Sequence, residues 1–330
     1  MRTTLTFSLL VALAVAAPPM PAQAVLGPRD YDPQVATAVA QLAAQVRAQG
    51  LPFTVGVNPA MQYDLSQLCG TRVELRQADY QAHAAGGYLN FEAAEEVDAS
   101  TLPSRYVGYA STVKDQGQCG SCWDFSTIAT LEAAALKSHG YAQATVNADG
   151  SITPSGDYRI LSEQQVLSCN PFGYSCNGGW YAFDMLMPQK AGQGGYYQGA
   201  IPASGFPYVA RQTTCRFAAT SYTPVSAWGY VGDGNSIPPV AAIKAAIYTY
   251  GSVSAAVNAD NYFQAYTGGV FVDPIRSAQT NHAINLVGWD DSKQAWLLKN
   301  SWGPYWGVNG FMWIRYGTAQ VGTAPAWCQD

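Results

Sequence analysis

The sequence predicts an α+β protein in which a mainly helical half precedes a half rich in strands. In the first half, apolar residues follow Cys122 at helical spacing, and Lys137, His139 and Gly140 mark the end of that helix. After Cys215, short runs rich in β-branched and aromatic residues alternate with turn residues. We therefore expect a helical unit and an antiparallel β unit that face each other.

Composition limits the classes of protein to consider. The chain has 330 residues, 48% hydrophobic and 12% charged, so it can bury a sizeable core in one or two domains. Its net charge of -5 gives no reason to expect nucleic-acid binding.

The first residues have the features of a secretory signal peptide, residues 1–24. Arg2 is positive, Leu5 to Ala17 is apolar, and a cleavage site of small residues precedes Val25. No later stretch has about 18 uncharged apolar residues, so we expect no membrane span. The predicted location is secreted or periplasmic.

Seven cysteines in an exported chain indicate disulfides, and an odd count leaves one thiol free. Cys122 is the candidate because it lies in the first turn of a helix. There the unpaired N–H groups and the helix dipole favour an anion, which lowers the pKa of a thiol. The six others allow three bridges in 15 ways; they are Cys69, Cys119, Cys169, Cys176, Cys215 and Cys328.

Residues 25–100 have the pattern of an N-terminal arm. Asp32 and Pro33 can begin a helix that Gly50 ends, and the following PFTVGVNPAM alternates like a short strand. Residues 77–100 are rich in Ala, Gly, Tyr and Glu and suit an extended linker along a surface.

Turn and capping signals place the later elements. Asp149-Gly150 predicts a hairpin, Ser162 begins a short helix, and another helix is expected from Val240 to Tyr250. The expected strands are Val253–Val257, Val270–Val272, His282–Trp289, Ala295–Lys299 and Phe311–Arg315.

A nucleophilic thiol needs a base to take its proton, and the chain has three histidines. His83 lies in the arm, and His139 lies at a helix C-terminus, where the dipole favours a cation. His282, in the sequence NHA, is the remaining candidate for the general base.

Several sequence blocks resemble those of the papain-like cysteine peptidases. They are QGQCGSCWDFS at 116–126, LSEQ with its following Cys, CNGG, NHA around His282, and KNSWGPYWG around Asn300. The resemblance covers Leu102 to about Gly317. It implies a peptidase domain at 101–330 with a papain-like two-lobed fold. The helical lobe, about 115–225, would carry the nucleophile helix and face an antiparallel β-barrel-like lobe, about 226–320.

The resemblance also implies a role for each catalytic residue. His282 would take the proton of Cys122, and Asn300 would orient the His282 ring. The side chain of Gln116 and the backbone N–H of Cys122 would stabilise the oxyanion. Trp302 would shield the hydrogen bond between His282 and Asn300 from water.

For substrate binding, the resemblance implies that Gly178 and Gly179 hydrogen-bond an extended peptide. Trp180 follows them, and Ala256 and Ala283 would be small neighbours in the specificity pocket. We expect an apolar side chain before the scissile residue, and an endopeptidase instead of an exopeptidase.

The resemblance further implies two disulfides, Cys119–Cys176 and Cys169–Cys215. The family's usual third bridge lacks a residue, because Ile275 stands where many members carry Cys. Cys328 is left to pair with Cys69 or to remain unpaired.

Asp124 departs from the resemblance, because a small residue is usual after Cys-Trp. A carboxylate two positions after the nucleophile could oppose thiolate formation. Ser121 to Asp124 also has the form of a capping box, in which Asp124 reaches back to the backbone N–H of the N-cap residue. We favour the cap.

The arm resembles the inhibitory propeptides of the same family in having a helix followed by G-x-N. An inhibitory propeptide and a structural arm that never leaves both fit the sequence. Leu102-Pro103 resembles the start of a mature peptidase, so we hypothesise cleavage near Ala99 to Thr101.

The sequence therefore predicts a secreted, monomeric cysteine endopeptidase. It would act on proteins or peptides without a metal or organic cofactor, with its own propeptide as an inhibitor. Two alternatives are a catalytically inactive relative that serves as a binding protein, and an enzyme that transfers the acyl group to an amine. The absence of an Asn-x-Ser/Thr sequon fits a bacterial exported protein.

Overall fold

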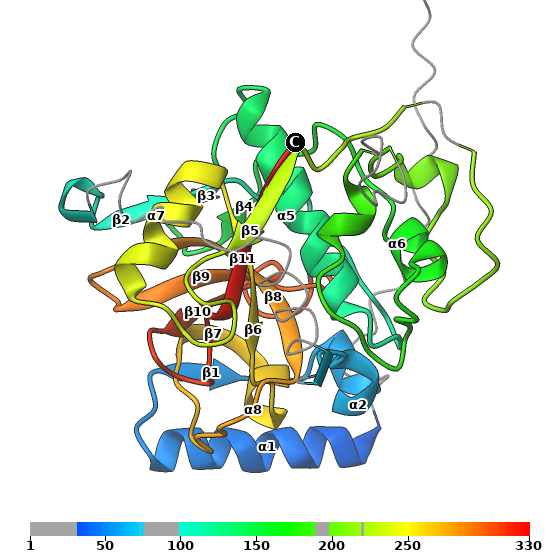
Figure 1. Cartoon of the computed structure of the whole chain (residues 1–330). Coiled ribbons are helices and arrows are strands. Elements are labelled where there is room, and N and C mark those ends of the chain that lie inside the picture. The colour runs from blue at the N-terminus through cyan, green and yellow to red at the C-terminus, as the bar shows by residue number, and fades with distance from the viewer. Residues whose placement is uncertain (1–31, 73, 76–98, 189–197, 219–220) are drawn as a thin grey trace, which may run out of the picture.

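A long helix, α5 (Cys122–Ser138), packs across a large sheet near the centre of the molecule (Figure 1). The computed structural model describes residues 32–72, 74–75, 99–188, 198–218 and 221–330. Within these residues, most strands lie on one side of α5 and α6 lies on the other. This arrangement confirms the predicted α+β class.

Nine strands form the large sheet in the described part of the chain. Their order is β1-β7-β10-β9-β8-β6-β11-β5, and β2 pairs with β8. Neighbouring strands are antiparallel except β10 and β7. The strands are β1 (Phe53–Val55), β2 (Arg105–Val107), β5 (Ala227–Tyr230), β6 (Val253–Val257), β7 (Tyr266–Phe271), β8 (His282–Asp290), β9 (Ala295–Lys299), β10 (Phe311–Arg315) and β11 (Thr323–Gln329).

All five strands predicted in the second half are present as β6 to β10, although β7 begins earlier than expected. The predicted hairpin is also present, as β3 (Thr145–Val146) and β4 (Ile152–Thr153). The sequence did not predict β2, β5 or β11.

Capping groups explain where the helices begin. Asp32 accepts a hydrogen bond from the N–H of Gln34 at 2.8 Å, and Pro33 takes the first helical position. Ser162 accepts from the N–H of Gln165 at 3.1 Å. The other helices are α1 (Pro33–Ala48), α2 (Leu65–Leu68), α6 (Glu163–Cys169), α7 (Val240–Tyr250) and α8 (Asn261–Gln264). Short 3-10 helices lie at Pro59–Gln62, Ala99–Thr101, Phe183–Leu186 and Ala203–Gly205.

The structure buries α5 on nearly all sides, whereas the sequence predicted a single apolar face. Apart from Ala129 and the last residues, Lys137 and Ser138, every residue of the helix is buried. The acidic side chains of Asp124 and Glu132 therefore lie inside the protein. A helix surrounded in this way belongs to the core.

The apolar core has two large clusters among the described residues. One joins α5 to α6 and includes Trp123, Leu131, Leu167, Trp180 and Phe183. The other lies on the sheet and includes Phe263, Phe271, Trp289, Trp302 and Trp306. Each buried side chain of this size stabilises the fold by roughly 1.5–3 kcal/mol. Because Cys122 belongs to the first cluster and Trp302 to the second, the candidate site lies where the clusters meet.

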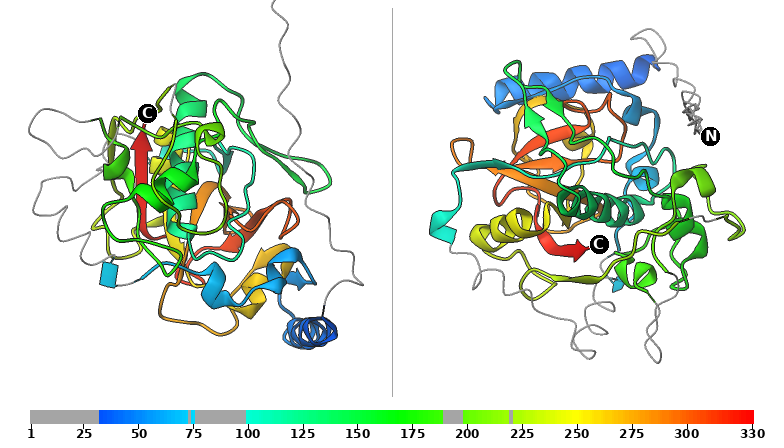
Figure 2. Two further views of the ribbon diagram at one scale, coloured as in Figure 1. Left: turned by 90° about the vertical axis from the view of Figure 1, so that its right-hand side faces the viewer. Right: turned by 90° about the horizontal axis from the view of Figure 1, so that it is seen from above.

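The N-terminal arm docks on the edge of the sheet (Figures 1 and 2). Strand β1 pairs antiparallel with β7, with Phe53 opposite Gly269. The hydroxyl of Tyr262 donates to Gln45 of α1. The predicted helix and strand of the arm are thus confirmed. The predicted signal peptide lies outside the described residues, as does the predicted linker apart from residues 99 and 100.

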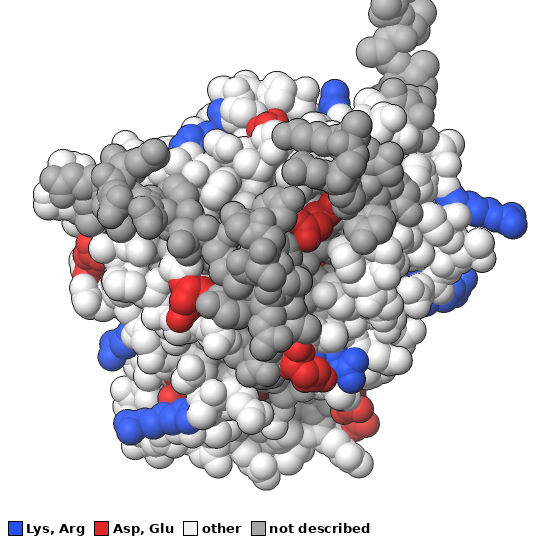
Figure 3. All heavy atoms as spheres, in the orientation of Figure 1, with Lys and Arg blue, Asp and Glu red and all other residues white. Residues whose placement is uncertain are grey.

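Charged side chains of both signs are spread over the face shown in Figure 3, and neither forms a patch outside the grey atoms. This face therefore lacks the basic surface that binds nucleic acid. Among the described residues, no helix combines the length and apolarity that crossing a bilayer requires.

Candidate active site

Cys122 is the first residue of α5 and is fully buried. Its Sγ accepts hydrogen bonds from the backbone N–H of Gly70, at 3.2 Å, and from that of Ala283. Burial nevertheless raises the pKa of the Cys122 thiol to about 11, and these N–H groups offset only part of the effect. With the arm in place, the thiol is protonated at neutral pH.

His282 begins β8, next to the Ala283 N–H that bonds the thiol. Its Nε2 lies 2.8 Å from Oδ1 of Asn300, which follows β9. Burial lowers the pKa of His282 to about 4, against the opposite effects of Asn300 and the Leu68 backbone. The structure therefore brings together the predicted nucleophile, base and orienting amide, with the base neutral.

Trp302 lies beside this pair, as the sequence predicted. Its ring centroid is 4.7 Å from that of His282, and the indole is buried. The ring of Phe263 packs against both Trp302 and His282. Aromatic rings thus exclude water from the hydrogen bond between His282 and Asn300.

Gln116 is fully buried, and its side chain makes three hydrogen bonds. Its Nε2 donates to the carbonyl of Leu68 at 2.8 Å and to that of Cys119 at 2.8 Å. Its Oε1 accepts from the Ser301 hydroxyl at 2.7 Å. The Leu68 carbonyl of the arm therefore already accepts the hydrogen bond that the Gln116 side chain is predicted to donate to the oxyanion.

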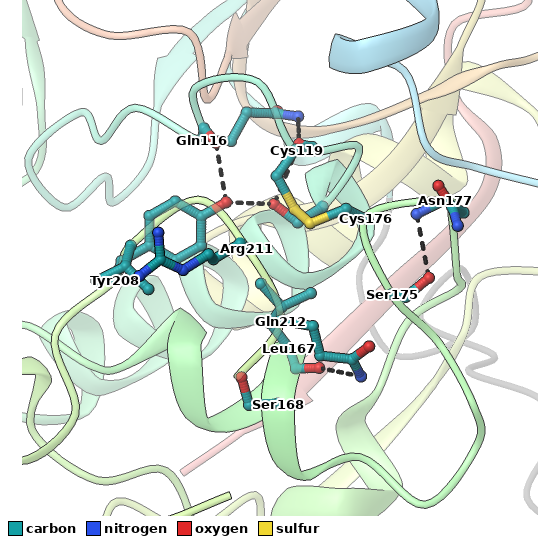
Figure 4. The surroundings of a disulfide bond; sticks show 12 residues. Gln116, Cys119, Leu167, Ser168, Ser175, Cys176, Asn177, Tyr208, Arg211 and Gln212 are labelled. Carbon is teal, nitrogen blue, oxygen red and sulfur yellow. Dashed lines mark hydrogen bonds between the residues drawn. A yellow bond between two sulfur atoms is a disulfide. The ribbon is translucent and has the colours of Figure 1, made fainter. Parts of the chain in front are cut away.

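Tyr208 connects the loop of Gln116 to the start of α5 (Figure 4). Its hydroxyl lies 2.9 Å from the carbonyl of Gln116 and 2.8 Å from the hydroxyl of Ser121. The hydroxyl of Tyr208 can donate to the carbonyl only if it accepts from Ser121. Its ring packs edge-on against Phe125. No sequence signal pointed to this residue.

The arm crosses the site as an extended segment between α2 and residue 72. The N–H of Gly179 donates to the carbonyl of Gly70 at 2.9 Å, and the N–H of Thr71 donates to the carbonyl of Asn281 at 3.1 Å. A Cβ on Gly70 would lie 1.7 Å from the carbonyl oxygen of Gly120. Only glycine permits this close approach to the nucleophile loop.

The predicted substrate-binding glycines contact this segment. Gly179 hydrogen-bonds it, and a Cβ there would lie 2.6 Å from the Trp123 ring. Gly178 lies against the Arg72 side chain. Gly179 therefore presents its N–H to an extended chain, whereas the N–H and carbonyl of Gly178 are bonded to Ser175 within the loop.

The other predicted pocket residues lie in the buried cluster beside α5. Ala256 of β6 and Ala283 of β8 face each other across the strand pair. Trp180 is buried, and its indole N–H donates to the Tyr230 hydroxyl at 2.7 Å.

The capping box predicted at the start of α5 is absent. The Ser121 side chain makes no capping hydrogen bond, because its hydroxyl lies near Tyr208 and the Cys119 carbonyl. Neither carboxylate oxygen of Asp124 has a hydrogen-bond partner among the described residues. Burial raises the pKa of Asp124 well above its ordinary value, and Glu163 adds to the shift.

A cluster of buried charges lies behind the nucleophile helix. The Lys114 ammonium is 2.6 Å from the carboxylates of both Glu132 and Glu163. Lys299 donates to Ser111 at 2.7 Å, and burial lowers the pKa of Lys299 to about 8. A cavity of about 20 Å³ among these groups has room for a single water. The cluster ties α5, α6 and β9 together.

Both implied disulfides, Cys119–Cys176 and Cys169–Cys215, are present. The first joins the nucleophile loop to the CNGG loop (Figure 4). Cys69, Cys122 and Cys328 are free among the described residues, so of the two alternatives left open for Cys328, the unpaired one is present and the pairing with Cys69 is not. The physical reason is location: Cys328 is buried in β11 opposite Trp228, whereas Cys69 lies in the arm beside the nucleophile.

Sequence reasoning missed the residues by which the arm contacts the site. Leu68 and Gly70 carry no motif, because their role depends on contacts with residues about fifty positions away in the chain. Ser301 could have been found, since it lies in the KNSWG block next to Asn300.

Comparisons with known proteins agree with this geometry. A model of the papain family cysteine proteases matches residues 93–328. "Digestive cysteine proteinase 1" of Homarus americanus is 33% identical over 235 residues, which are 69% of this chain and 65% of the relative. "Oryzain gamma chain" of Oryza sativa subsp. japonica is 31% identical over 300 residues, covering 86% of this chain and 73% of the relative.

Solved proenzymes have the same fold. Digestive procathepsin L2 from Tenebrio molitor aligns with a TM-score of 0.69 at 24% identity, covering 90% of this chain and 91% of its own. A recombinant stem bromelain precursor aligns with a TM-score of 0.68 at 24% identity, covering 90% of each chain. The relatives named are eukaryotic, so they give no support to the bacterial origin that the missing sequon suggested.

Proposed function

Because the chain belongs to the papain family of cysteine proteases, we propose that it is an exported cysteine endopeptidase made as an inactive zymogen. The observation that carries this proposal is the backbone of the arm on the nucleophile, with the N–H of Gly70 3.2 Å from the Cys122 sulfur. The match spans 65% of the lobster relative's length, so substrates and partners are part of the proposal.

The arm inhibits because it offers the nucleophile the wrong group. The sulfur of Cys122 faces the backbone N–H of Gly70 in the arm. A thiolate attacks a carbonyl carbon, and an N–H group offers none. The carbonyl of Leu68, one peptide group earlier in the arm, accepts from the Gln116 amide that an oxyanion would need. The arm thus fills the site without presenting a cleavable bond to the thiol.

Burial under the arm also keeps the catalytic pair uncharged. The pKa of Cys122 is raised to about 11 and that of His282 is lowered to about 4, both mainly by burial. Removal of the arm returns water to both groups, which favours the thiolate and the imidazolium together. The pair then titrates as a unit.

In the open enzyme, each residue has the role that its position allows. The Cys122 thiolate attacks the peptide carbonyl, and the Gln116 amide and the Cys122 N–H stabilise the oxyanion. His282, oriented by Asn300, protonates the leaving amine. Water then hydrolyses the acyl-enzyme.

Substrates are proteins or peptides bound in extended form. Gly179 supplies a backbone hydrogen bond, as it does to the arm, and Gly178 allows the close approach of the extended chain. Trp180, Ala256 and Ala283 would form the apolar wall of the pocket for the side chain before the scissile residue. We expect a monomer that requires neither metal nor cofactor.

Processing would remove residues 25–100 after the signal peptide, residues 1–24, has directed the chain to a secreted or periplasmic location. The structure of a cysteine protease of Carica candamarcensis supports this division. It aligns with a TM-score of 0.56 at 27% identity, and the alignment covers 99% of that protein but only 69% of this chain. The catalytic domain would then be residues 101–330, with lobes at about 115–225 and 226–320.

The test uses the full chain and its Cys122→Ala variant. Both are incubated with dithiothreitol at about pH 4, near the lowered pKa of His282, and then given a peptide library. We expect only the unmodified chain to shorten to a new N-terminus near residues 99–101 and to cleave peptides. Uncleaved peptides would support the binding protein, and products joined to an added amine would support acyl transfer; either result contradicts the proposal.

A further inference from the structure

Cys69 lies in the arm between the two residues that contact the catalytic groups. The preceding carbonyl, that of Leu68, accepts from Gln116 at 2.8 Å. The following N–H, that of Gly70, donates to the Cys122 sulfur at 3.2 Å. Cys69 is therefore held at the nucleophile for as long as the arm is docked.

The backbone geometry limits how far Cys69 is from Cys122. Standard bond lengths place the Cys69 Cα about 2.4 Å from the Gly70 nitrogen, so it lies at most about 5.6 Å from the Cys122 sulfur. In a disulfide with ordinary bond lengths, the Cα of one cysteine lies within about 4.5 Å of the sulfur of the other. Rotation of the Cys69 side chain with a small backbone shift can therefore bring the two sulfurs together.

Both thiols are unpaired. Burial raises the pKa of Cys122 to about 11 and that of Cys69 well above its ordinary value, so alkaline pH favours their exchange with a disulfide. Four cysteines are already paired, and among the described residues the remaining free thiols are Cys69, Cys122 and Cys328. Cys328 is fully buried in β11, away from the arm. Cys69 keeps some exposed surface whereas Cys122 has none, so an external reagent meets Cys69 first.

We propose that Cys69 is a redox site whose thiol forms a reversible disulfide with Cys122 in the unprocessed chain, so that the arm is fixed covalently to the nucleophile. The oxidant is a small disulfide such as oxidised glutathione. Cys69 attacks it and releases one small thiol, and Cys122 then attacks the mixed disulfide at Cys69 and releases the second. Two S–H bonds are replaced by one S–S bond, and the small disulfide is reduced to two thiols that carry the protons.

The bond changes what activation requires. This consequence rests on the proposed zymogen, because the disulfide removes the nucleophile and retains the arm at once. Acid alone cannot then release the arm, and a dithiol reductant must first open the bond. An oxidising compartment would keep the chain latent until it meets reducing conditions.

The test maps disulfides in the full chain after equilibration with oxidised glutathione at about pH 8. Free thiols are blocked with iodoacetamide, and the unreduced peptides are analysed by mass spectrometry. We expect a linked pair of peptides containing Cys69 and Cys122, with Cys328 alkylated. Acid activation without reductant is expected to fall by about tenfold or more.

Two variants make the result specific. Cys328→Ala is the matched control and is expected to retain the link, whereas Cys69→Ala leaves Cys122 free or carrying glutathione. The proposal is overturned if the unmodified chain keeps both thiols free, carries glutathione on Cys122, or links Cys69 to Cys328. The mapping needs no enzymatic activity, so it distinguishes failure of this proposal from failure of the proposed peptidase function.

Discussion

A buried carboxyl without a described hydrogen-bond partner lies two residues after the nucleophile. Burial raises the pKa of Asp124 well above 3.8, so the folded chain holds a proton that the unfolded chain releases. The contribution of the protonated Asp124 to stability is therefore fully present below pH 3.8, and it is lost as the pH rises through the raised pKa of the folded state. Two charged groups also act on the pKa of Asp124: Glu163 raises it and Lys114 lowers it, and the effect of Glu163 is the larger.

Asp124→Asn is expected to stabilise the protein at neutral pH. The amide has the same shape and never ionises, so the free energy of unfolding should rise by about 1–3 kcal/mol at pH 7. The gain should vanish near pH 4. Thermal unfolding of the Cys122→Ala chain, with and without the second change, measures it.

Asp149→Asn serves as the control, because the exposed Asp149 carboxylate has a pKa lowered by Ser151. A loss of stability at pH 7 in Asp124→Asn would contradict the assignment of a neutral Asp124.

The Tyr208 hydroxyl is expected to position the oxyanion donor. Tyr208→Phe removes the contacts to Ser121 and to the Gln116 carbonyl, which we value at about 1 kcal/mol. We predict that kcat falls roughly fivefold with KM nearly unchanged. Alkylation of Cys122 by iodoacetamide, which forms no oxyanion, should keep its rate.

Tyr316→Phe is the matched control, since the Tyr316 hydroxyl donates to Asp291 at 2.9 Å far from the nucleophile. If Tyr208→Phe slowed alkylation as much as hydrolysis, the prediction would be contradicted. The Tyr208 hydroxyl would then stabilise the start of α5, including the Cys122 thiol, and would not act specifically on the oxyanion donor.

The sequence identifies residues whose chemistry is local. Cys122 was found from a helix start, and His282 from its place among three histidines, with motif blocks naming Asn300 and Gln116. Asp124 was misread because the capping pattern competes with contacts of Ser121 that come from elsewhere in the fold. Such contacts leave no pattern in the neighbouring sequence.

At the scale of elements, β1 anchors the arm to the sheet. Phe53 is buried and its ring lies 4.9 Å from that of Phe271 in β7. Backbone pairing alone leaves an edge strand weakly held, so the aromatic contact supplies much of the docking free energy.

Phe53→Ala is expected to weaken docking by about 3 kcal/mol, the usual cost of deleting a buried aromatic ring. The full chain should then activate faster at about pH 6.5, while the processed enzyme, which lacks residue 53, keeps its kcat. The rate of appearance of activity measures this effect.

Thr37→Ala, on the exposed face of α1, is the control. An unchanged activation rate in Phe53→Ala would show that β1 does not limit release of the arm.

Strand prediction succeeded where the pattern was regular and failed where it was not. β8 and β9 carry long apolar runs and were found with nearly correct bounds. β11 contains Ala324 at a φ of 48° followed by Pro325, and its pairing with β6 shifts register there. Local rules read such a segment as a turn, so only tertiary pairing makes it a strand.

For the whole molecule, docking of the arm should depend on pH through His282. The covered site lowers the pKa of His282 from 6.5 to about 4, so docking disfavours the imidazolium. The contribution of His282 to docking is therefore fully present above pH 6.5 and weakens by about 1.4 kcal/mol for each pH unit between 6.5 and about 4.

We predict that the rate of arm release in reductant rises as the pH falls from about 6.5 to 4 and then levels off. Tryptic sensitivity of the arm in the Cys122→Ala chain reports release without self-cleavage. A release rate independent of pH over this range would contradict the role of His282.

The path of the arm through the site was beyond sequence reasoning. Its helix and strand were predictable from Asp32, Pro33 and the alternation after Gly50, but two roles remained open for it. The contact between Gly70 and Cys122 joins parts of the chain that are distant in sequence. It covers the nucleophile, and this favours the inhibitory role of the arm over a purely structural one.

The most direct test of the covered nucleophile is the reactivity of the Cys122 thiol. In dithiothreitol at pH 7, iodoacetamide is added to the full chain and to the acid-processed protein, and alkylation of Cys122 is followed by peptide mass spectrometry. A pKa near 11 leaves about a hundredfold less thiolate than the ordinary value of 9, and the processed protein holds more thiolate than that, so the full chain should react at least about a hundredfold more slowly. Equal rates in the two proteins would contradict the account.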